Sequence, residues 1–141
     1  MTAMGTTPGA RKRILCVEDD EDTRHMMHFL LDEYGYEPVI AASVSDALER
    51  ARCGGLALCI LDHGFIESNG IELCQQIRVF DSALPIVFYS GAGYEADIRK
   101  GLDAGAQAYV VKPDFDRLKE TIDRLIDKPT FTTQNTNQKR G

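Results

Sequence analysis

The sequence lacks several features that would place it in common protein classes. No apolar run approaches the roughly 20 residues that a membrane-spanning helix needs, and the N-terminal residues contain no apolar segment typical of a secretion signal. Basic residues are outnumbered, 16 against 22 acidic ones, which gives a formal net charge of −6. Since nucleic-acid binding needs clustered lysines and arginines, we expect a cytoplasmic protein that neither inserts into membranes nor binds nucleic acid.

The sequence also lacks a recognisable cysteine or histidine metal site. It has four cysteines, and their spacing matches no zinc-ligand pattern. Most of them lie in or beside apolar runs, so we expect buried free thiols rather than disulfides. The cysteines are Cys16, Cys53, Cys59 and Cys74. His25 and His28 lie three residues apart but have no evident third ligand, so we expect both to face solvent.

A length of 141 residues allows one domain of ordinary size. Residues 1–11 and 129–141 are polar and have no apolar periodicity, which predicts disordered terminal segments. The folded domain is then expected over residues 12–128. The segment after the last predicted helix is too short for a DNA-binding or catalytic module, so we expect the domain to act on other proteins.

Between these ends, short apolar runs alternate with segments of helical periodicity. The apolar runs predict strands at residues 14–17, 38–42, 56–61, 85–89 and 108–111. A helix is predicted after each strand, and the fourth helix, with its apolar positions at Tyr94, Ile98 and Leu102, is expected to be loosened by Gly101. Strict alternation predicts an α/β fold with a doubly wound parallel sheet of strand order 2-1-3-4-5 and helices on both faces.

Acidic residues follow the first and the third predicted strands. Residues 18–22 are all acidic, and Asp62 comes directly after the third strand. Capping of the following helix explains one or two acids at the first position but not five. In a sheet of this order, ligands bind beyond the carboxyl ends of strands 1 and 3. We therefore expect Glu18, Asp19 and Asp62 to share one pocket.

Three carboxylates in one pocket repel one another, and a divalent cation is the natural counter-charge. Ligation by oxygen alone suits Mg²⁺, with Mn²⁺ as a possible substitute. The same repulsion predicts that Asp62→Asn stabilises the metal-free protein by roughly 1 kcal/mol or more.

Two further polar side chains end the remaining strands of the predicted sheet. Ser90 ends the fourth strand, and Lys112 ends the fifth strand just before Pro113. Each residue alone is compatible with an ordinary turn or a surface lysine. The complete set of acids, hydroxyl and ammonium group, however, could hold Mg²⁺ together with a phosphoryl group. One of the carboxylates would then be the nucleophile.

These residues occur in the order and spacing of a known family. From residue 13 to about residue 126 the chain resembles a receiver domain of the response regulators of two-component systems. The resemblance implies the flavodoxin-like (βα)5 fold. It depends on the segments 14–20, 61–62, 69–70, 85–91 and 105–113.

The resemblance assigns roles to the acidic residues. It implies that Asp62 is the phosphoacceptor and that Asp62 also binds Mg²⁺. Asp19 would bind the ion directly and Glu18 mainly through water. The backbone carbonyl of Gly64 would supply a further ligand.

The resemblance also assigns a switch. Ser90 and Lys112 would contact phosphoryl oxygens. Tyr109 occupies the switch position, where an aromatic ring turns inward as the hydroxyl of Ser90 moves toward the phosphoryl group. The peptide bond between Lys112 and Pro113 is expected to be cis.

The sequence departs from the family pattern near the phosphoacceptor. Residues 65–66 are Phe-Ile where a Met-Pro type pair is usual, which predicts a freer loop. His63 is unusual at its position, and we expect its side chain to point to solvent. The charged pairs that mark dimers of the transcription-factor subfamily are missing before Tyr109, so we expect a monomer or a weak dimer.

The leading hypothesis is a single-domain response regulator and not an enzyme with a separate substrate. A histidine kinase or a histidine phosphotransfer protein would phosphorylate Asp62. An unidentified protein would then read the signal at the face formed by the fourth helix, the fifth strand and the fifth helix. Two alternatives stay open: a phosphate sink or phosphorelay intermediate, and a flavodoxin-like binding module that is not phosphorylated.

Overall fold

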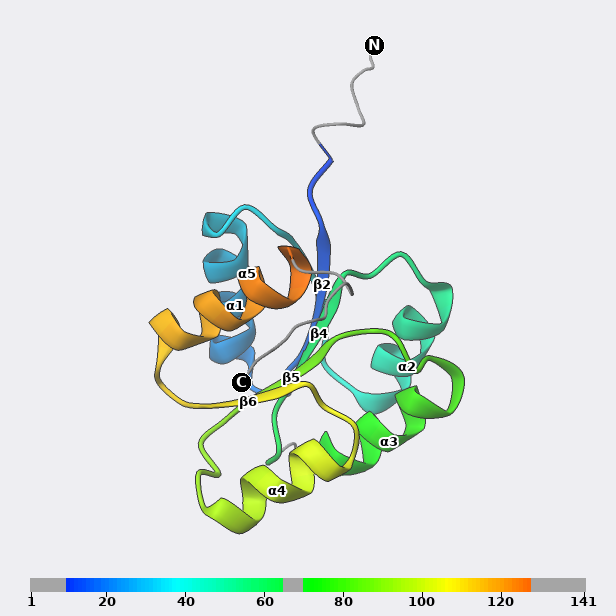
Figure 1. The fold of residues 1–141 in the computed structure, drawn as a ribbon. Coiled ribbons are helices and arrows are strands. Elements are labelled where there is room, and N and C mark those ends of the chain that lie inside the picture. Colours follow the sequence, from blue (N-terminus) through cyan, green and yellow to red (C-terminus); the bar gives the residue numbers. More distant parts are fainter. Residues whose placement is uncertain (1–9, 65–69, 128–141) are drawn as a thin grey trace.

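A five-stranded parallel sheet forms the middle layer of the molecule (Figure 1). The computed structural model describes residues 10–64 and 70–127. The strands are β2 (Arg13–Val17), β3 (Glu37–Ala41), β4 (Leu58–Leu61), β5 (Ile86–Ser90) and β6 (Ala108–Val111). Their order in the sheet is β3-β2-β4-β5-β6, and each neighbouring pair is parallel. The predicted doubly wound order, 2-1-3-4-5 in chain order, is confirmed.

Helices cover both faces of the sheet. The helices are α1 (Glu21–Glu33), α2 (Val44–Cys53), α3 (Gly70–Phe80), α4 (Glu95–Asp103) and α5 (Phe115–Asp127). Figure 1 shows α1 and α5 on one face and α2, α3 and α4 on the other. This arrangement brings the carboxyl ends of β2 and β4 side by side, where strand order reverses and ligands bind in such folds.

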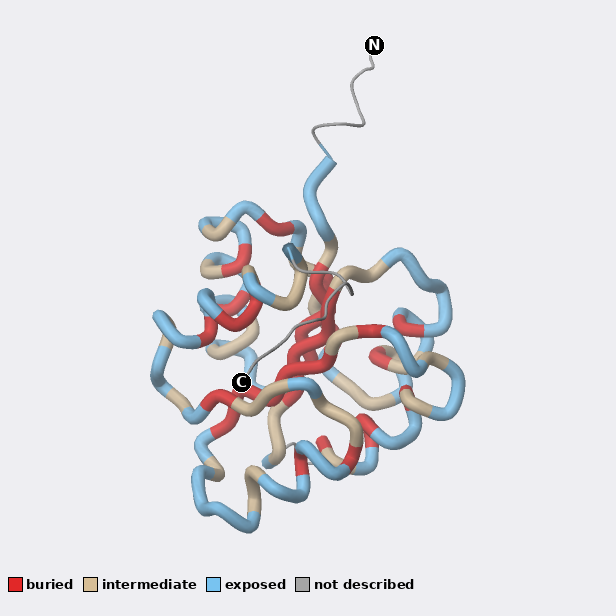
Figure 2. The backbone as a smooth tube through the Cα atoms, viewed as in Figure 1, coloured by how far each residue is buried: buried red, intermediate tan, exposed pale blue. Residues whose placement is uncertain are grey.

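The strands are buried on both faces, as their continuous apolar runs predict. One core cluster packs Met27 and Leu31 of α1 and Leu118 and Ile122 of α5 against the sheet. A second cluster lies between the sheet and α2, α3 and α4. Figure 2 shows the buried residues concentrated along the central strands. Three of the cysteines lie in these clusters and all four are free, so the prediction of buried free thiols is confirmed for these three, whereas Cys53 is exposed.

The row of five acids divides between helix capping and the carboxyl edge of the sheet. Asp20 is the N-cap of α1, and its carboxylate accepts a hydrogen bond from the Thr23 N–H at 2.9 Å. Glu21 and Asp22 lie in the first turn of the helix, where negative charge is favourable. Capping therefore accounts for the last three acids, and Glu18 and Asp19 lie before the helix.

Helix α4 differs from its prediction. Of the predicted apolar stripe, Tyr94, which is the N-cap, is 82% exposed, Leu102 is 43% exposed and Ile98 is partly buried, so no large apolar side chain of the stripe is fully buried. The buried residue is Gly101. A Cβ atom there would lie 2.8 Å from the ring of Tyr109 and 3.0 Å from that of Phe88. Gly101 thus lets α4 approach the sheet closely. Helix propensity alone predicts only that a glycine at this position destabilises the helix.

The predicted terminal segments, 1–11 and 129–141, lie almost entirely outside the described residues. Arg11 is described, and its guanidinium lies 2.9 Å from the Asp32 carboxylate. It also donates hydrogen bonds to the carbonyls of Gly35 and Tyr36, at the turn between α1 and β3. Within the described parts of the chain, no helix is long and apolar enough to span a membrane.

Candidate functional site

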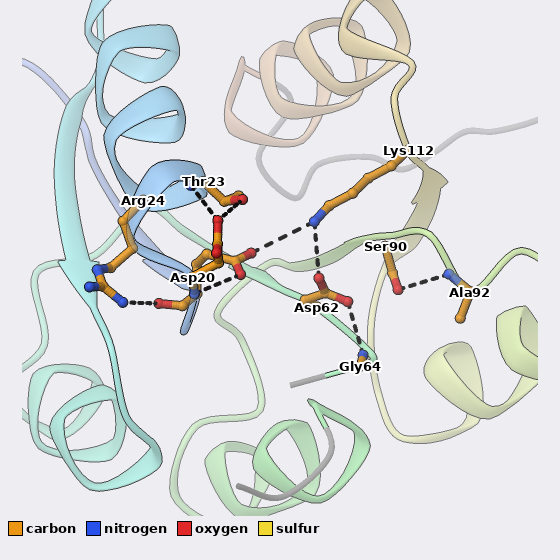
Figure 3. A network of polar contacts seen from close by, with 9 residues as sticks. Asp20, Thr23, Arg24, Asp62, Gly64, Ser90, Ala92 and Lys112 are labelled. Carbon is orange, nitrogen blue, oxygen red and sulfur yellow. Dashed lines mark hydrogen bonds and ion pairs between the residues drawn. The ribbon is translucent and has the colours of Figure 1, made fainter. Parts of the chain in front are cut away.

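Lys112 lies between two carboxylates at the carboxyl edge of the sheet (Figure 3). Its Nζ atom donates a hydrogen bond to Asp62 Oδ2 at 3.0 Å and lies 3.7 Å from Glu18 Oε1. The three residues come from the ends of β6, β4 and β2, which the strand order brings to one edge. The structure therefore gathers these predicted site residues around one ammonium group.

The carboxyl groups of Glu18 and Asp62 are shifted in opposite directions. Burial raises the pKa of Glu18 above its ordinary 4.5, and the Asp20 N–H and Lys112 oppose this rise without cancelling it. Burial also acts to raise the pKa of Asp62, but hydrogen bonds from the Gly64 N–H and the Lys112 ammonium outweigh it, so this pKa lies below 3.8. The hydrogen bonds to Asp62 therefore favour its ionised form, whereas burial disfavours the charge of Glu18.

Lys112 stays protonated in this setting. Burial lowers its pKa, but the hydrogen bond to Asp62 and the charges of Asp62 and Glu18 raise it above its ordinary 10.5. The aromatic ring of Tyr89 lies 5.6 Å from Nζ and offers a further favourable contact. The Lys112–Pro113 peptide bond is cis, as the resemblance implies.

Backbone contacts fix Glu18 at the end of β2. Its N–H donates to the Ala41 carbonyl at 3.0 Å, and its own carbonyl accepts from the Arg24 guanidinium at 3.2 Å. Its carboxylate accepts from the Asp20 N–H at 3.2 Å. Glu18 is 7% exposed, whereas Asp19 is half-buried at the same edge.

Two glycines shape the loop that carries Asp62. The Gly64 N–H donates to Asp62 Oδ1 at 2.9 Å. At Gly70, the first residue of α3, a Cβ atom would lie 2.3 Å from the Asp62 carbonyl oxygen, which is far inside contact distance. Gly70 is therefore required for α3 to begin beside Asp62. In the sequence, Gly70 stands out only as part of a motif, and the predicted freer loop at residues 65–66 lies outside the described residues.

Ser90 and Tyr109 meet at the loop between β5 and α4. The Ser90 hydroxyl accepts a hydrogen bond from the Ala92 N–H at 3.1 Å. The Tyr109 hydroxyl donates to the Ala92 carbonyl at 2.6 Å, and its ring stacks on Phe88 with centroids 5.4 Å apart. The two predicted switch residues lie on different strands, and both form hydrogen bonds with the backbone of Ala92.

The prediction for His63 is wrong. Its side chain does not point to solvent but is 17% exposed, with its Nε2 atom 3.9 Å from Asp97 Oδ1 on α4. Its ring lies 6.3 Å from that of Phe88 and 6.4 Å from that of Tyr109. The direction of this side chain depends on how α4 packs, so residue type alone could not reveal it. The other two histidines, His25 and His28, are both exposed, as predicted.

The acidic groups have the donor chemistry that Mg²⁺ prefers, since they offer oxygen alone. Glu18 is a buried carboxylate with a raised pKa, which a nearby cation would relieve. Among the described residues, no three His, Cys, Asp or Glu side chains are already grouped as metal ligands. The donor set therefore fits the ion chemically, although it is not preassembled.

Comparison with known proteins shows which family has this arrangement of residues. The family model described as "Response regulator receiver domain" matches residues 14–123. The chain belongs to this family. Receiver domains of response regulators are signalling domains of two-component systems, so the resemblance noted in the sequence is confirmed.

Curated relatives carry a similar segment within longer chains. The DNA-binding response regulator MtrA of Mycolicibacterium smegmatis is 35% identical over 103 residues, which cover 73% of this chain and 45% of that protein. The transcriptional regulatory protein ZraR of Salmonella typhimurium is 33% identical over 114 residues, 80% of this chain and 26% of that protein. The receiver chain matches less than half of the length of these two relatives.

Solved structures agree on the fold. The response regulator TrrA of Thermotoga maritima, in complex with Mg²⁺ and BeF, is 32% identical with a TM-score of 0.73, over 81% of this chain and 98% of that one. A receiver domain of a Pseudomonas aeruginosa sensor histidine kinase, which has a magnesium ion in its active-site cleft, has a TM-score of 0.76 at 23% identity, over 84% of this chain and 99% of that one. Homologous receivers are therefore known to bind Mg²⁺.

Proposed function

We propose that this receiver domain accepts a phosphoryl group on Asp62 from a histidine kinase or a histidine phosphotransfer protein. The observation that carries the proposal is the contact of 3.0 Å between Lys112 Nζ and the Asp62 carboxylate, beside the buried carboxylate of Glu18. It combines an ionised nucleophile with a fixed positive charge at the edge of the sheet where ligands bind.

The chemical step follows from these groups. A carboxylate oxygen of Asp62 attacks the phosphorus of a phosphohistidine, a new P–O bond forms, and the P–N bond breaks. The histidine nitrogen of the donor keeps the bonding electron pair and takes up a proton. Asp62 is suited to the attack because its lowered pKa keeps it ionised. Lys112 is placed to neutralise charge on the transferred group.

We propose that Glu18, Asp19, Asp62 and the backbone carbonyl of Gly64 would hold Mg²⁺, or Mn²⁺ in its place. The ion would neutralise negative charge on the phosphoryl oxygens and on the carboxylates that surround it. Support comes from the oxygen-only donor set and from the Mg²⁺ complexes of homologous receivers. Glu18 would take part as a buried, crowded carboxylate whose charge is unfavourable without a cation.

The signal would leave through the face formed by α4, β6 and α5. Ser90 would turn its hydroxyl toward the phosphoryl group, and Tyr109, which also holds Ala92, would respond. Large apolar side chains are exposed on α4 and β6, namely Tyr94, Leu102 and Val111. Their exposure supports a protein partner at this face.

The test is phosphorylation of the purified protein by acetyl phosphate and MgCl₂, followed by intact mass measurement. We expect one phosphoryl adduct in the wild type and none in Asp62→Asn. Asp20→Asn is the matched control, because it removes a nearby acid from the α1 N-cap while asparagine caps equally well. An adduct that persists in Asp62→Asn, or its loss in Asp20→Asn alone, would contradict the assignment.

A further inference from the structure

The side chain of His63 connects the phosphoacceptor loop to helix α4. Its backbone follows Asp62 directly, and its carbonyl accepts a hydrogen bond from the Gly70 N–H at 3.3 Å. From this position its imidazole reaches the stacked rings of Phe88 and Tyr109. The residue next to the phosphoacceptor therefore contacts the elements that would carry the signal.

The imidazole has an unsatisfied polar atom. Nε2 of His63 is buried and has no hydrogen-bond partner among the residues that the structure describes. A buried polar atom without a partner is unfavourable and uncommon. The Asp97 Oδ1 atom is 3.9 Å away, about 1 Å beyond hydrogen-bond distance. A small approach of the two groups would let Nε2–H donate to the carboxylate in a charge-assisted hydrogen bond.

Asp97 is coupled to the start of α4. It lies in the first turn of the helix, and its other carboxylate oxygen accepts a hydrogen bond from the Tyr94 N–H at 3.2 Å. Asp97 is only partly exposed, at 24%, so a contact with His63 would be shielded from water in part. A pull on Asp97 would consequently move the N-terminal turn of α4 rather than a free side chain.

We propose that His63 is a positioning residue that closes on Asp97 when Asp62 takes a phosphoryl group, and so draws the start of α4 toward the site. The proposal rests on the proposed function, in which Asp62 is the phosphoacceptor. It adds a second connection from Asp62 to α4, which does not depend on the hydrogen bonds that Ser90 and Tyr109 make to Ala92.

The test uses beryllofluoride with Mg²⁺ as the phosphoryl mimic. His63→Phe keeps an aromatic ring against Phe88 and Tyr109 but removes Nε2. Asp97→Asn removes the negative charge and keeps an oxygen for the Tyr94 N–H. His28→Phe, at an exposed position on α1, is the matched control. The measurements are beryllofluoride affinity, amide hydrogen exchange of residues 94–103 with and without the mimic, and melting temperature.

We expect His63→Phe to bind beryllofluoride roughly threefold to tenfold more weakly than the wild type, because the variant cannot form the hydrogen bond to Asp97 that accompanies binding. The change in hydrogen exchange of α4 on binding should fall to less than half. Asp97→Asn should act in the same direction, and the double variant should be little worse than either single variant, since both remove the same hydrogen bond. His28→Phe should match the wild type.

Equal beryllofluoride affinity and an equal α4 response in His63→Phe and the wild type would overturn the inference and leave the proposed function intact. A lower melting temperature without a change in affinity would also overturn it, because that outcome indicates packing alone. Failure of the wild type itself to bind beryllofluoride would instead contradict the role of Asp62, and the inference with it.

Discussion

At the scale of single residues, the site is governed by the unequal settings of two carboxylates. By sequence alone, Glu18 and Asp62 are equal members of a repelling cluster. The structure distinguishes them, because Asp62 receives hydrogen bonds from Lys112 and from the Gly64 N–H, whereas Glu18 is more deeply buried. The charge of Glu18 is therefore the one that lowers the stability of the fold. The expectation that Asp62→Asn stabilises the metal-free protein is revised accordingly.

Without Mg²⁺ at pH 7, we expect Glu18→Gln to stabilise the fold by about 1 kcal/mol, the usual scale of such effects. Asp62→Asn should instead leave the free energy of unfolding unchanged or lower it, since it removes the partner of Lys112. Urea denaturation of the three proteins checks this prediction. A gain in stability for Asp62→Asn that equals or exceeds that for Glu18→Gln would contradict it.

The two variants should also differ in pH dependence. The pKa of Glu18 is raised in the folded state, so its charge costs stability above that pKa, and the cost vanishes as pH falls toward the ordinary value of 4.5. The advantage of Glu18→Gln should therefore shrink from pH 7 to pH 4.5. The pKa of Asp62 is lowered, so its stabilising contribution is present above pH 3.8 and is lost as pH falls through the lowered value. Denaturation series from pH 7 to below pH 3.8 give both slopes.

The lifetime of the phosphoaspartate is a further property of individual residues. In receivers, the side chains two residues after the phosphoacceptor and two after the hydroxyl residue influence the hydrolytic water, and here these are Gly64 and Ala92. Neither side chain can hold a water, so we expect slow autodephosphorylation. Gly64→Asn combined with Ala92→Glu should shorten the lifetime on the order of tenfold. Among the described residues, the nearest atom to a Cβ at residue 64 is Asp62 Oδ1, at 3.7 Å, which is ordinary contact distance.

The measurement for this prediction is the decay of the phosphoryl adduct in Mg²⁺, followed by intact mass after the donor is removed. The initial extent of phosphorylation should stay unchanged in the double variant. An unchanged or longer lifetime would indicate that another feature of the loop sets the rate.

At the scale of secondary-structure elements, the position of α4 depends on close approach to β5 and β6. Helix propensity would make Gly101→Ala favourable by about 1 kcal/mol. The packing opposes this gain, because the added methyl group would lie 2.8 Å from the Tyr109 ring and 3.0 Å from the Phe88 ring. The steric effect should dominate, since both rings are held between neighbouring elements.

We expect Gly101→Ala to destabilise the protein by roughly 1–3 kcal/mol, as over-packing usually does. Thermal unfolding checks this expectation. Gly91→Ala is the matched control, because a Cβ atom at that residue meets no atom of the described residues within 4 Å. If Gly101→Ala melts at or above the wild-type temperature, α4 does not need its close contact with Tyr109.

At the scale of the whole molecule, the parallel sheet gathers residues that are far apart in the chain. Glu18 and Lys112 are separated by most of the domain, yet their charged groups lie 3.7 Å apart. This convergence couples ligand binding to global stability, because the unfolded chain has no such site.

We accordingly expect Mg²⁺ to raise the melting temperature and the free energy of unfolding, by about 2.7 kcal/mol at 100 times its Kd. Calorimetric scans over a MgCl₂ series test this. Asp62→Asn should show a much smaller dependence on Mg²⁺, whereas Asp20→Asn should retain it. A wild-type melting temperature that is independent of Mg²⁺ would contradict the proposed ion site.

Much of the fold could be predicted from the sequence because its signals are local. Continuous apolar runs identify buried parallel strands, and alternation with helices leaves few topologies. The same order explains why Glu18, Asp62 and Lys112 could be expected at one edge of the sheet. Helix α4 was harder to predict, because Tyr94 and Leu102 are exposed, Ile98 is only partly buried, and the buried residue of the helix is a glycine.

The sequence by itself therefore determined the element order, the strand order and the set of polar groups at the ends of the strands. The tertiary structure decided the properties that depend on packing between elements. These are the division of charge between Glu18 and Asp62, the close approach at Gly70 and Gly101, and the inward direction of His63. The physical reason is that periodicity reflects short-range geometry along the chain, whereas burial, pKa and side-chain direction depend on neighbours that only the folded molecule supplies.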